Sequence, residues 1–177
     1  MSGHGVSEML KLKNHMKKFL LLTIIITFYL QPNNVFAQKK KKSEKAFVTE
    51  LNNVLNKSEK QDGDYEGVMT IDSAFIINAA GVLAVTVRYT SDSAVTIVRL
   101  AAPIRSIQRV LYDLYLILQF GDEQVQLSES KNDEPLKEIR KGSWFRIGAP
   151  LPENMKYKVG VEKALKKLLG TYNKLPY

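Results

Sequence analysis

Between residues 68 and 128 the chain repeatedly alternates apolar with polar side chains, and only short turns separate the alternating stretches. A period of two predicts β-strands, because successive side chains of a strand point to opposite faces. We place strands at residues 68–78, 82–90, 94–102, 110–120, 124–128 and 144–147. Connections this short cannot lead to a parallel neighbour, so the strands are expected to form an antiparallel sheet.

Amphipathic helices are expected on both sides of these strands. Apolar residues recur at spacings of three and four from Phe47 to Leu55, with Ser43 as the expected N-cap and an end near Lys60. The same pattern predicts a closing helix at Val161, Ala164, Leu165, Leu168, Leu169 and Tyr172. Residues 131–142 are charged and are expected to form a loop with a brief helix inside it.

The predicted fold class is therefore α+β: an antiparallel β-meander of five or six strands flanked by an N-terminal and a C-terminal amphipathic helix. This order of elements is similar to pleckstrin-homology-like and cystatin-like arrangements. The similarity concerns architecture alone, and architecture does not determine function.

Residues 16–37 have the pattern of a cleavable bacterial signal peptide. Lysines follow Met16, residues 19–30 are almost entirely apolar, and Val35-Phe36-Ala37 suits a cleavage site near Ala37. The apolar stretch gives roughly 18 Å of helix, which is short for a hydrocarbon core of roughly 30 Å. We therefore expect a periplasmic or extracellular protein without a transmembrane span. Residues 1–15 are interpreted as a misassigned start, with Met16 as the true one; the alternative is that they extend the basic region of the signal peptide.

The basic residues gather near the start of the chain. Residues 38–45 contain five lysines (Lys39, Lys40, Lys41, Lys42 and Lys45) and are expected to form a flexible polar tail that could contact an anionic membrane surface. The same lysines oppose translocation of the preceding segment, so an uncleaved anchor is the alternative interpretation. Residues 46–177, the expected single domain, carry 17 basic against 16 acidic residues, which indicates no nucleic-acid partner.

Histidine and cysteine are missing from the predicted mature domain. The chain has no cysteine, and its two histidines, His4 and His15, precede the predicted cleavage site. Disulfides, Ser-His triads, thiol nucleophiles and zinc sites built from imidazole or thiolate are therefore excluded there. We expect no cofactor and no metal. The acidic run Asp62-Gly63-Asp64-Tyr65-Glu66 lacks the rest of a calcium loop and is interpreted as an ordinary turn.

Two groups of residues remain as candidates for binding. The first group, Asp72, Arg88 and Asp113, lies on the mixed face of the sheet, which is the expected contact surface. Asp72 and Asp113 stand within predicted strands, where they pair with Arg88 or Arg99 or, as an alternative, serve as the two carboxylates of a small hydrolase of envelope glycan. The second group consists of Tyr115, Trp144 and Arg146. We expect a non-catalytic binding or interaction domain of the cell envelope, with a protein, glycan or lipid as partner. A carrier with a closed apolar cavity between sheet and helix is a further alternative.

Overall fold

The structure, a computed structural model, describes residues 36–132, 134–151 and 155–173. It divides into two compact units, and the second, Lys42–Tyr177, holds all the strands. The predicted signal peptide lies outside the described residues except for Phe36 and Ala37, which are helical and exposed. Both histidines and residues 1–15 also lie outside, so cleavage and export stay predictions.

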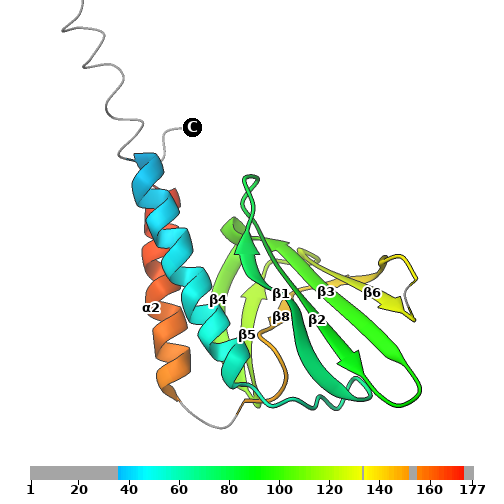
Figure 1. Cartoon of the computed structure of the whole chain (residues 1–177). Helices are drawn as coiled ribbons and strands as arrows, with labels where there is room; N and C mark the ends of the chain where they lie inside the picture. The colour runs from blue at the N-terminus through cyan, green and yellow to red at the C-terminus, as the bar shows by residue number, and fades with distance from the viewer. Residues whose placement is uncertain (1–35, 133, 152–154, 174–177) are drawn as a thin grey trace, which may run out of the picture. The chain divides into compact units, whose positions relative to one another are not determined.

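Five strands form one antiparallel sheet with the order β1-β2-β3-β6-β7 (Figure 1). The strands are β1 (Val68–Ile77), β2 (Val82–Thr90), β3 (Val95–Pro103), β6 (Val125–Lys131) and β7 (Lys137–Gly142). Four of them lie where the alternation of side chains predicts a strand, and each pairs with a neighbour in antiparallel register. The predicted α+β class and its antiparallel sheet are therefore confirmed.

A second sheet has three strands in the order β4-β5-β8: β4 (Ile107–Asp113), β5 (Tyr115–Phe120) and β8 (Trp144–Arg146). The prediction of one strand over residues 110–120 is wrong, because the chain reverses at the exposed Leu114, whose φ is 61°. In this hairpin Tyr112 pairs with Leu116 and Val110 with Leu118. The two residues of each pair are an even number of positions apart. The alternation of apolar and polar side chains therefore continues unchanged across the turn and does not reveal that the chain reverses.

The segment that was expected to be a charged loop contains an edge strand. Lys137–Gly142 form β7, and no described residue between 131 and 142 is helical, so the predicted brief helix is wrong. In the described chain β7 pairs with β6 alone. Charged side chains are frequent on edge strands because they discourage pairing with another chain. High polarity therefore did not distinguish this strand from a loop.

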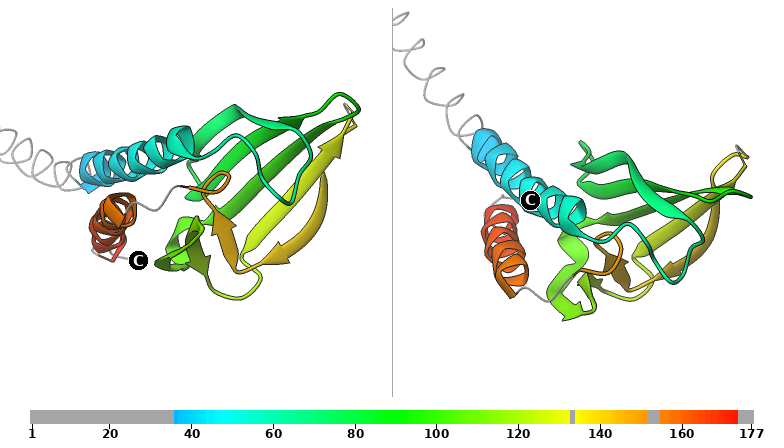
Figure 2. Two further views of the ribbon diagram at one scale, coloured as in Figure 1. Left: turned by 90° about the horizontal axis from the view of Figure 1, so that it is seen from below. Right: turned by 60° about the horizontal axis from the view of Figure 1, so that its bottom comes forward.

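Within the second unit, two helices lie side by side next to the strands (Figure 2). They are α2 (Met155–Tyr172) and the part from residue 42 onward of the first helix, which spans residues 36–57. Ser43 is buried within the first helix, and its Oγ lies 3.1 Å from Oγ1 of Thr171 in α2. The hydroxyl of Tyr172 donates to the carboxylate of Glu44. Ser43 is therefore not an N-cap, and residues 38–45 are helical rather than a flexible tail. Lysine is a good helix former, so its abundance there did not imply disorder.

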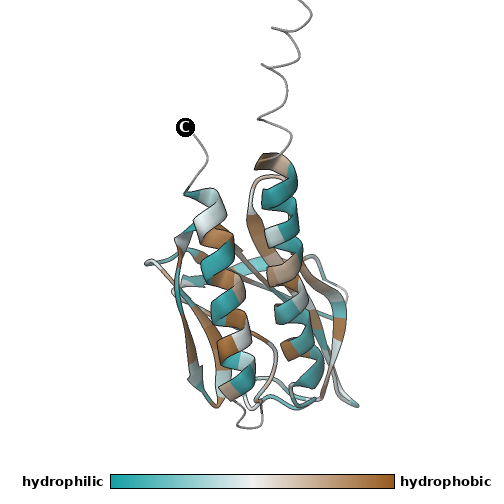
Figure 3. Ribbon diagram, turned by 90° about the vertical axis from the view of Figure 1, so that its left-hand side faces the viewer, coloured by the Kyte–Doolittle hydropathy of each residue, from teal (hydrophilic) through white to brown (hydrophobic). Residues whose placement is uncertain are grey.

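One hydrophobic core joins the helices to both sheets. Its members from the helices include Phe47, Leu51, Val161 and Leu168, and its members from the strands include Phe75, Phe120 and Phe145. Figure 3 shows hydrophobic and hydrophilic residues interleaved along both helices, as expected for helices that bury one face. The predicted apolar faces of both helices belong to this core.

Candidate functional site

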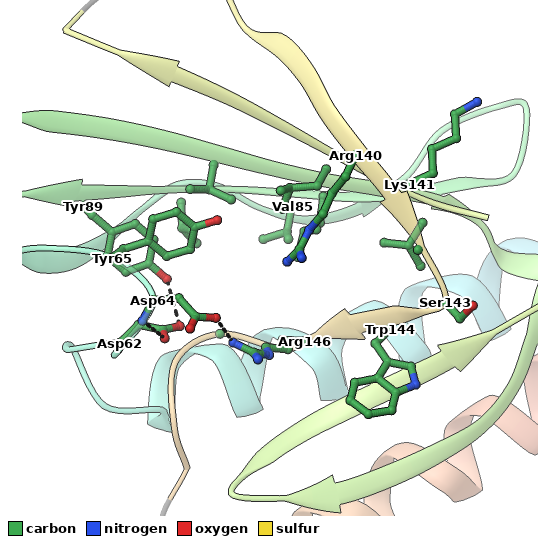
Figure 4. A pocket seen from close by; sticks show the side chains of 17 residues that line it. Asp62, Asp64, Tyr65, Val85, Tyr89, Arg140, Lys141, Ser143, Trp144 and Arg146 are labelled. Atoms are coloured by element: carbon green, nitrogen blue, oxygen red, sulfur yellow. Dashed lines mark hydrogen bonds and ion pairs between the residues drawn. The ribbon is translucent and has the colours of Figure 1, made fainter. Parts of the chain in front are cut away.

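A pocket of about 560 Å³ opens between the five-stranded sheet and β8 (Figure 4). Every second residue of β2, β3 and β6 points to this face of the sheet, because side chains alternate along a strand. The floor consists of six aliphatic side chains: Val85, Val87, Val98, Leu100, Val125 and Leu127. All except Leu100 are buried, and all six belong to the core or pack against it. The packed interior therefore holds the floor in place.

Four residues that line the pocket lie in one row across the sheet. Val85 pairs with Leu100, Leu100 pairs with Leu127, and Leu127 pairs with Arg140. Neighbouring strands are about 4.8 Å apart, so the row extends for roughly 14 Å from β2 to β7. The row is apolar on three strands and ends in a guanidinium group at the edge of the sheet.

The turn that precedes β1 supplies a buried carboxylate to the pocket wall. Asp62 is 8% exposed. Its Oδ1 accepts hydrogen bonds from the Tyr115 hydroxyl at 3.0 Å and from the backbone N–H of Asp64 at 3.1 Å. Its Oδ2 accepts a longer bond of 3.4 Å from the hydroxyl of Tyr89. Three donors from β2, β5 and the turn thus converge on Asp62, as burial of a charge requires.

Two stacked tyrosines stand beside this carboxylate. The rings of Tyr65 and Tyr89 have centroids 4.6 Å apart and an interplanar angle of 18°. The Tyr65 hydroxyl donates to Glu129 at 2.9 Å. Burial, reinforced by the neighbouring carboxylates, raises the pKa of Tyr65, Tyr89 and Tyr115. These three phenols therefore remain protonated at neutral pH and act as hydrogen-bond donors.

Arg146 joins β8 to the same turn. Its guanidinium pairs with the carboxylate of Asp64 and lies 4.3 Å from the centre of the Tyr115 ring. Burial opposes the charge of Arg146, but the hydrogen bond and the charge of Asp64 outweigh this effect and raise the arginine pKa. Both partners of this ion pair are thus engaged at the pocket wall.

Strand β7 brings Arg140 and Lys141 to the rim. Figure 4 shows the Arg140 side chain extending into the pocket, whereas the ammonium group of Lys141 points away from it. No hydrogen bond or ion pair within the described part of the chain engages the Arg140 guanidinium. Arg140 is therefore the positive charge in the pocket that a ligand can reach without breaking an existing contact.

A second hollow of about 740 Å³ adjoins the first and shares five of its lining residues, namely Asp64, Tyr65, Leu127, Arg140 and Arg146. Its remaining lining is mixed, with Thr96 and Ile139 beside the charged Glu66, Glu129 and Lys131. The apolar part of the site therefore lies in the first pocket, and Arg140 stands between the two hollows.

Three of the six residues proposed from the sequence meet at this site. Trp144 and Arg146 line the pocket, and Tyr115 contacts both Asp62 and Arg146. Trp144 is 59% exposed, so its side chain is not part of the core.

The other three proposed residues lie elsewhere. Asp72 and Arg88 form an ion pair with a shortest N–O distance of 2.8 Å across β1 and β2, as the cross-strand interpretation predicts. Asp113 is exposed beside the turn at Leu114, and neither it nor Asp72 lines either pocket. The concave pair of carboxylates that a hydrolase would need is not formed by Asp72 and Asp113.

Sequence reasoning missed Asp62, Tyr89 and Arg140 as site residues. Asp62 stood in a run interpreted as an ordinary turn, because its partners Tyr89 and Tyr115 are 27 and 53 positions away. The parity of Tyr89 with Val85 and Val87 was the available signal that its ring shares their face. Arg140 carried no signal, because its strand was taken for a loop.

Within the described ranges, no three acidic or histidine side chains are grouped as a metal ion would require. None of the helices described combines the length and the apolar character needed to cross a membrane. Comparisons with protein-family models, curated proteins and solved structures found no match to this chain.

Proposed function

We propose that this protein is a non-catalytic binding domain that holds an apolar ligand in the pocket on the five-stranded sheet. The observation that carries the proposal is the continuous floor of six aliphatic side chains beneath a space of about 560 Å³. Pockets for small molecules generally measure 300–1,000 Å³ and combine an apolar lining with a few polar groups. The pocket agrees with this description in both its size and its lining.

The state of the polar groups around the pocket supports binding rather than catalysis. The Asp62 carboxylate already accepts three hydrogen bonds, and Asp64 is paired with Arg146. The raised pKa values of Tyr89 and Tyr115 disfavour the phenolate form that a nucleophile or base would need. The polar groups nearest the pocket are therefore engaged in holding its wall, which supports a binding role.

The predicted signal peptide extends the proposal to location. With cleavage near Ala37, the domain would act in the periplasm or outside the cell. Lipids of the cell envelope are a source of apolar chains in that compartment. The proposal therefore combines two of the expectations from the sequence, an envelope binding domain and an apolar-ligand carrier, with an open pocket on the sheet in place of a closed cavity under a helix.

Binding of a neutral apolar dye tests this function. A ligand that buries the equivalent of about fifteen methylene groups gains about 12 kcal/mol, and association costs at least about 4 kcal/mol. The balance is therefore at most about 8 kcal/mol, which corresponds to a dissociation constant no tighter than about 1 μM. We expect the emission of N-phenyl-1-naphthylamine to rise on binding at micromolar protein.

Two variants on β3 localise the dye. Leu100→Trp fills the pocket from its partly buried floor position and should abolish the rise in emission. Arg99→Trp adds the same side chain to the exposed residue next to it, which points to the opposite face, and should leave binding unchanged. Equal binding by both variants, with urea midpoints like that of the wild type, would contradict the proposal.

A further inference from the structure

We infer that the ligand is an anionic amphiphile with a single alkyl chain, whose carboxylate-like head is bound by Arg140. This inference rests on the proposed function and names the class of ligand. It follows from the order of side chains across the pocket and from the state of each charged group around it.

The row of paired residues sets the direction of the ligand. Val85, Leu100 and Leu127 offer an apolar track over three neighbouring strands, and Arg140 follows Leu127 on the fourth. The track and its charged end together extend for roughly 14 Å. A flexible chain with one charged end can lie along this row with its methyl end over β2 and its head at β7. A large rigid apolar molecule would instead cover Arg140 and remove its charge from water at a cost.

The charges around the pocket select the sign of the head group. Asp64 and Arg146 neutralise each other, and Asp62 already accepts three hydrogen bonds. The Arg140 guanidinium points into the pocket and has no such engagement within the described chain. Guanidinium groups bind carboxylates and phosphates through two parallel hydrogen bonds, which favours an anionic head over a neutral or cationic one.

Two ligands with the same chain and different heads test the inference. Laurate and lauryl alcohol share an alkyl chain, so competition with N-phenyl-1-naphthylamine separates the contribution of the head from that of the chain. We expect laurate to bind at least about tenfold more tightly than lauryl alcohol to the wild type. This preference should shrink as salt is raised, because the rim is open to solvent.

Variants that each replace one basic side chain then identify the residue that binds the head group. Arg140→Gln should remove the preference for laurate and leave the affinity for lauryl alcohol unchanged, which also shows that the variant is folded. Arg99→Gln on the opposite face and Lys141→Gln, whose ammonium points away from the pocket, should keep the preference. A preference that survives in Arg140→Gln, or that is lost in Lys141→Gln instead, overturns the assignment.

The outcome also distinguishes failure of this inference from failure of the proposed function. Equal affinity of the wild type for laurate and lauryl alcohol overturns the anionic ligand but keeps an apolar pocket. If the wild type binds neither ligand and no dye, both proposals are wrong.

Discussion

Replacement of Asp62 should lower the free energy of unfolding by an amount that depends on whether the hydroxyls of Tyr89 and Tyr115 find another hydrogen-bond acceptor. In Asp62→Ala, the Tyr89 hydroxyl loses its acceptor in a residue that is only 3% exposed, which costs about 1–3 kcal/mol. The backbone N–H of Asp64 loses its hydrogen bond in the turn, which lowers the free energy of unfolding by about 1 kcal/mol. The Tyr115 hydroxyl, in a partly exposed residue, can bond to water instead. We expect a total loss of about 3 kcal/mol.

Asp62→Asn is the matched conservative variant. Its amide oxygen can replace Oδ1 and keep the bonds from Tyr115 and Asp64, while its NH₂ group can donate to the oxygen of Tyr89. What is lost is the charge on the acceptor, so the expected cost is about 1 kcal/mol. Urea unfolding followed by far-ultraviolet circular dichroism measures both free energies.

A double variant provides the decisive comparison. Tyr89→Phe alone removes a long hydrogen bond and should cost less than about 1 kcal/mol. In the Asp62→Ala background the same change removes a buried hydroxyl that has no partner, so it should increase stability by about 1 kcal/mol. The account of this wall is refuted if Tyr89→Phe destabilises the Asp62→Ala protein as much as it destabilises the wild type.

Three further predictions concern the turn, the phenols and the rim. Gly67→Ala should lower the free energy of unfolding in urea by at least about 2 kcal/mol. The reason is that the φ of Gly67 is 100° and the new Cβ would lie 2.2 Å from the backbone oxygen of Thr90. Gly63→Ala, with open space around the new Cβ, should leave the free energy of unfolding nearly unchanged, and equal losses in the two variants would contradict this prediction. Four phenols have a folded-state pKa above the usual value of about 10: Tyr65, Tyr89, Tyr115 and Tyr172. As the pH rises past about 10, the unfolded chain loses these protons before the folded protein does, so the free energy of unfolding should fall. The prediction is wrong if all the tyrosines of the folded protein become phenolates near pH about 10, as measured by ultraviolet absorbance. Trp144, the chain's single tryptophan, lines the pocket and is exposed. Bound laurate should therefore protect the fluorescence of Trp144 from quenching by acrylamide. Unchanged quenching at saturating laurate would contradict binding in this pocket.

The elements that the sequence predicted correctly are those whose periodicity reflects burial on one face. β2 spans Val82–Thr90 as expected, because it alternates a buried with a more exposed face along most of its length. α2 buries Val161, Leu165 and Leu168, which recur at spacings of four and three. Where such a pattern exists, local sequence and tertiary packing require the same conformation.

The errors arose where the pattern was uninformative. The hairpin at Leu114 keeps the alternation in phase, and β7 has no apolar face to reveal it. The turn at Asp62 acquires its role from tyrosines far along the chain. Spacing within a short segment cannot indicate such contacts. The aliphatic floor and the wall residues Tyr115, Trp144 and Arg146 could therefore be predicted from the sequence, whereas Asp62 and Arg140 could not.

The position of Arg140 on a sheet edge links ligand preference to colloidal behaviour. β7 has one neighbouring strand in the described chain, and its charged side chains keep foreign strands from extending the sheet. Loss of charge on this strand would lower the affinity for an anion. It would also allow the β7 edges of two molecules to pair with each other. Variants selected for a neutral ligand are therefore expected to aggregate more readily than the wild type, and a compensating charge elsewhere on β7 should restore their solubility.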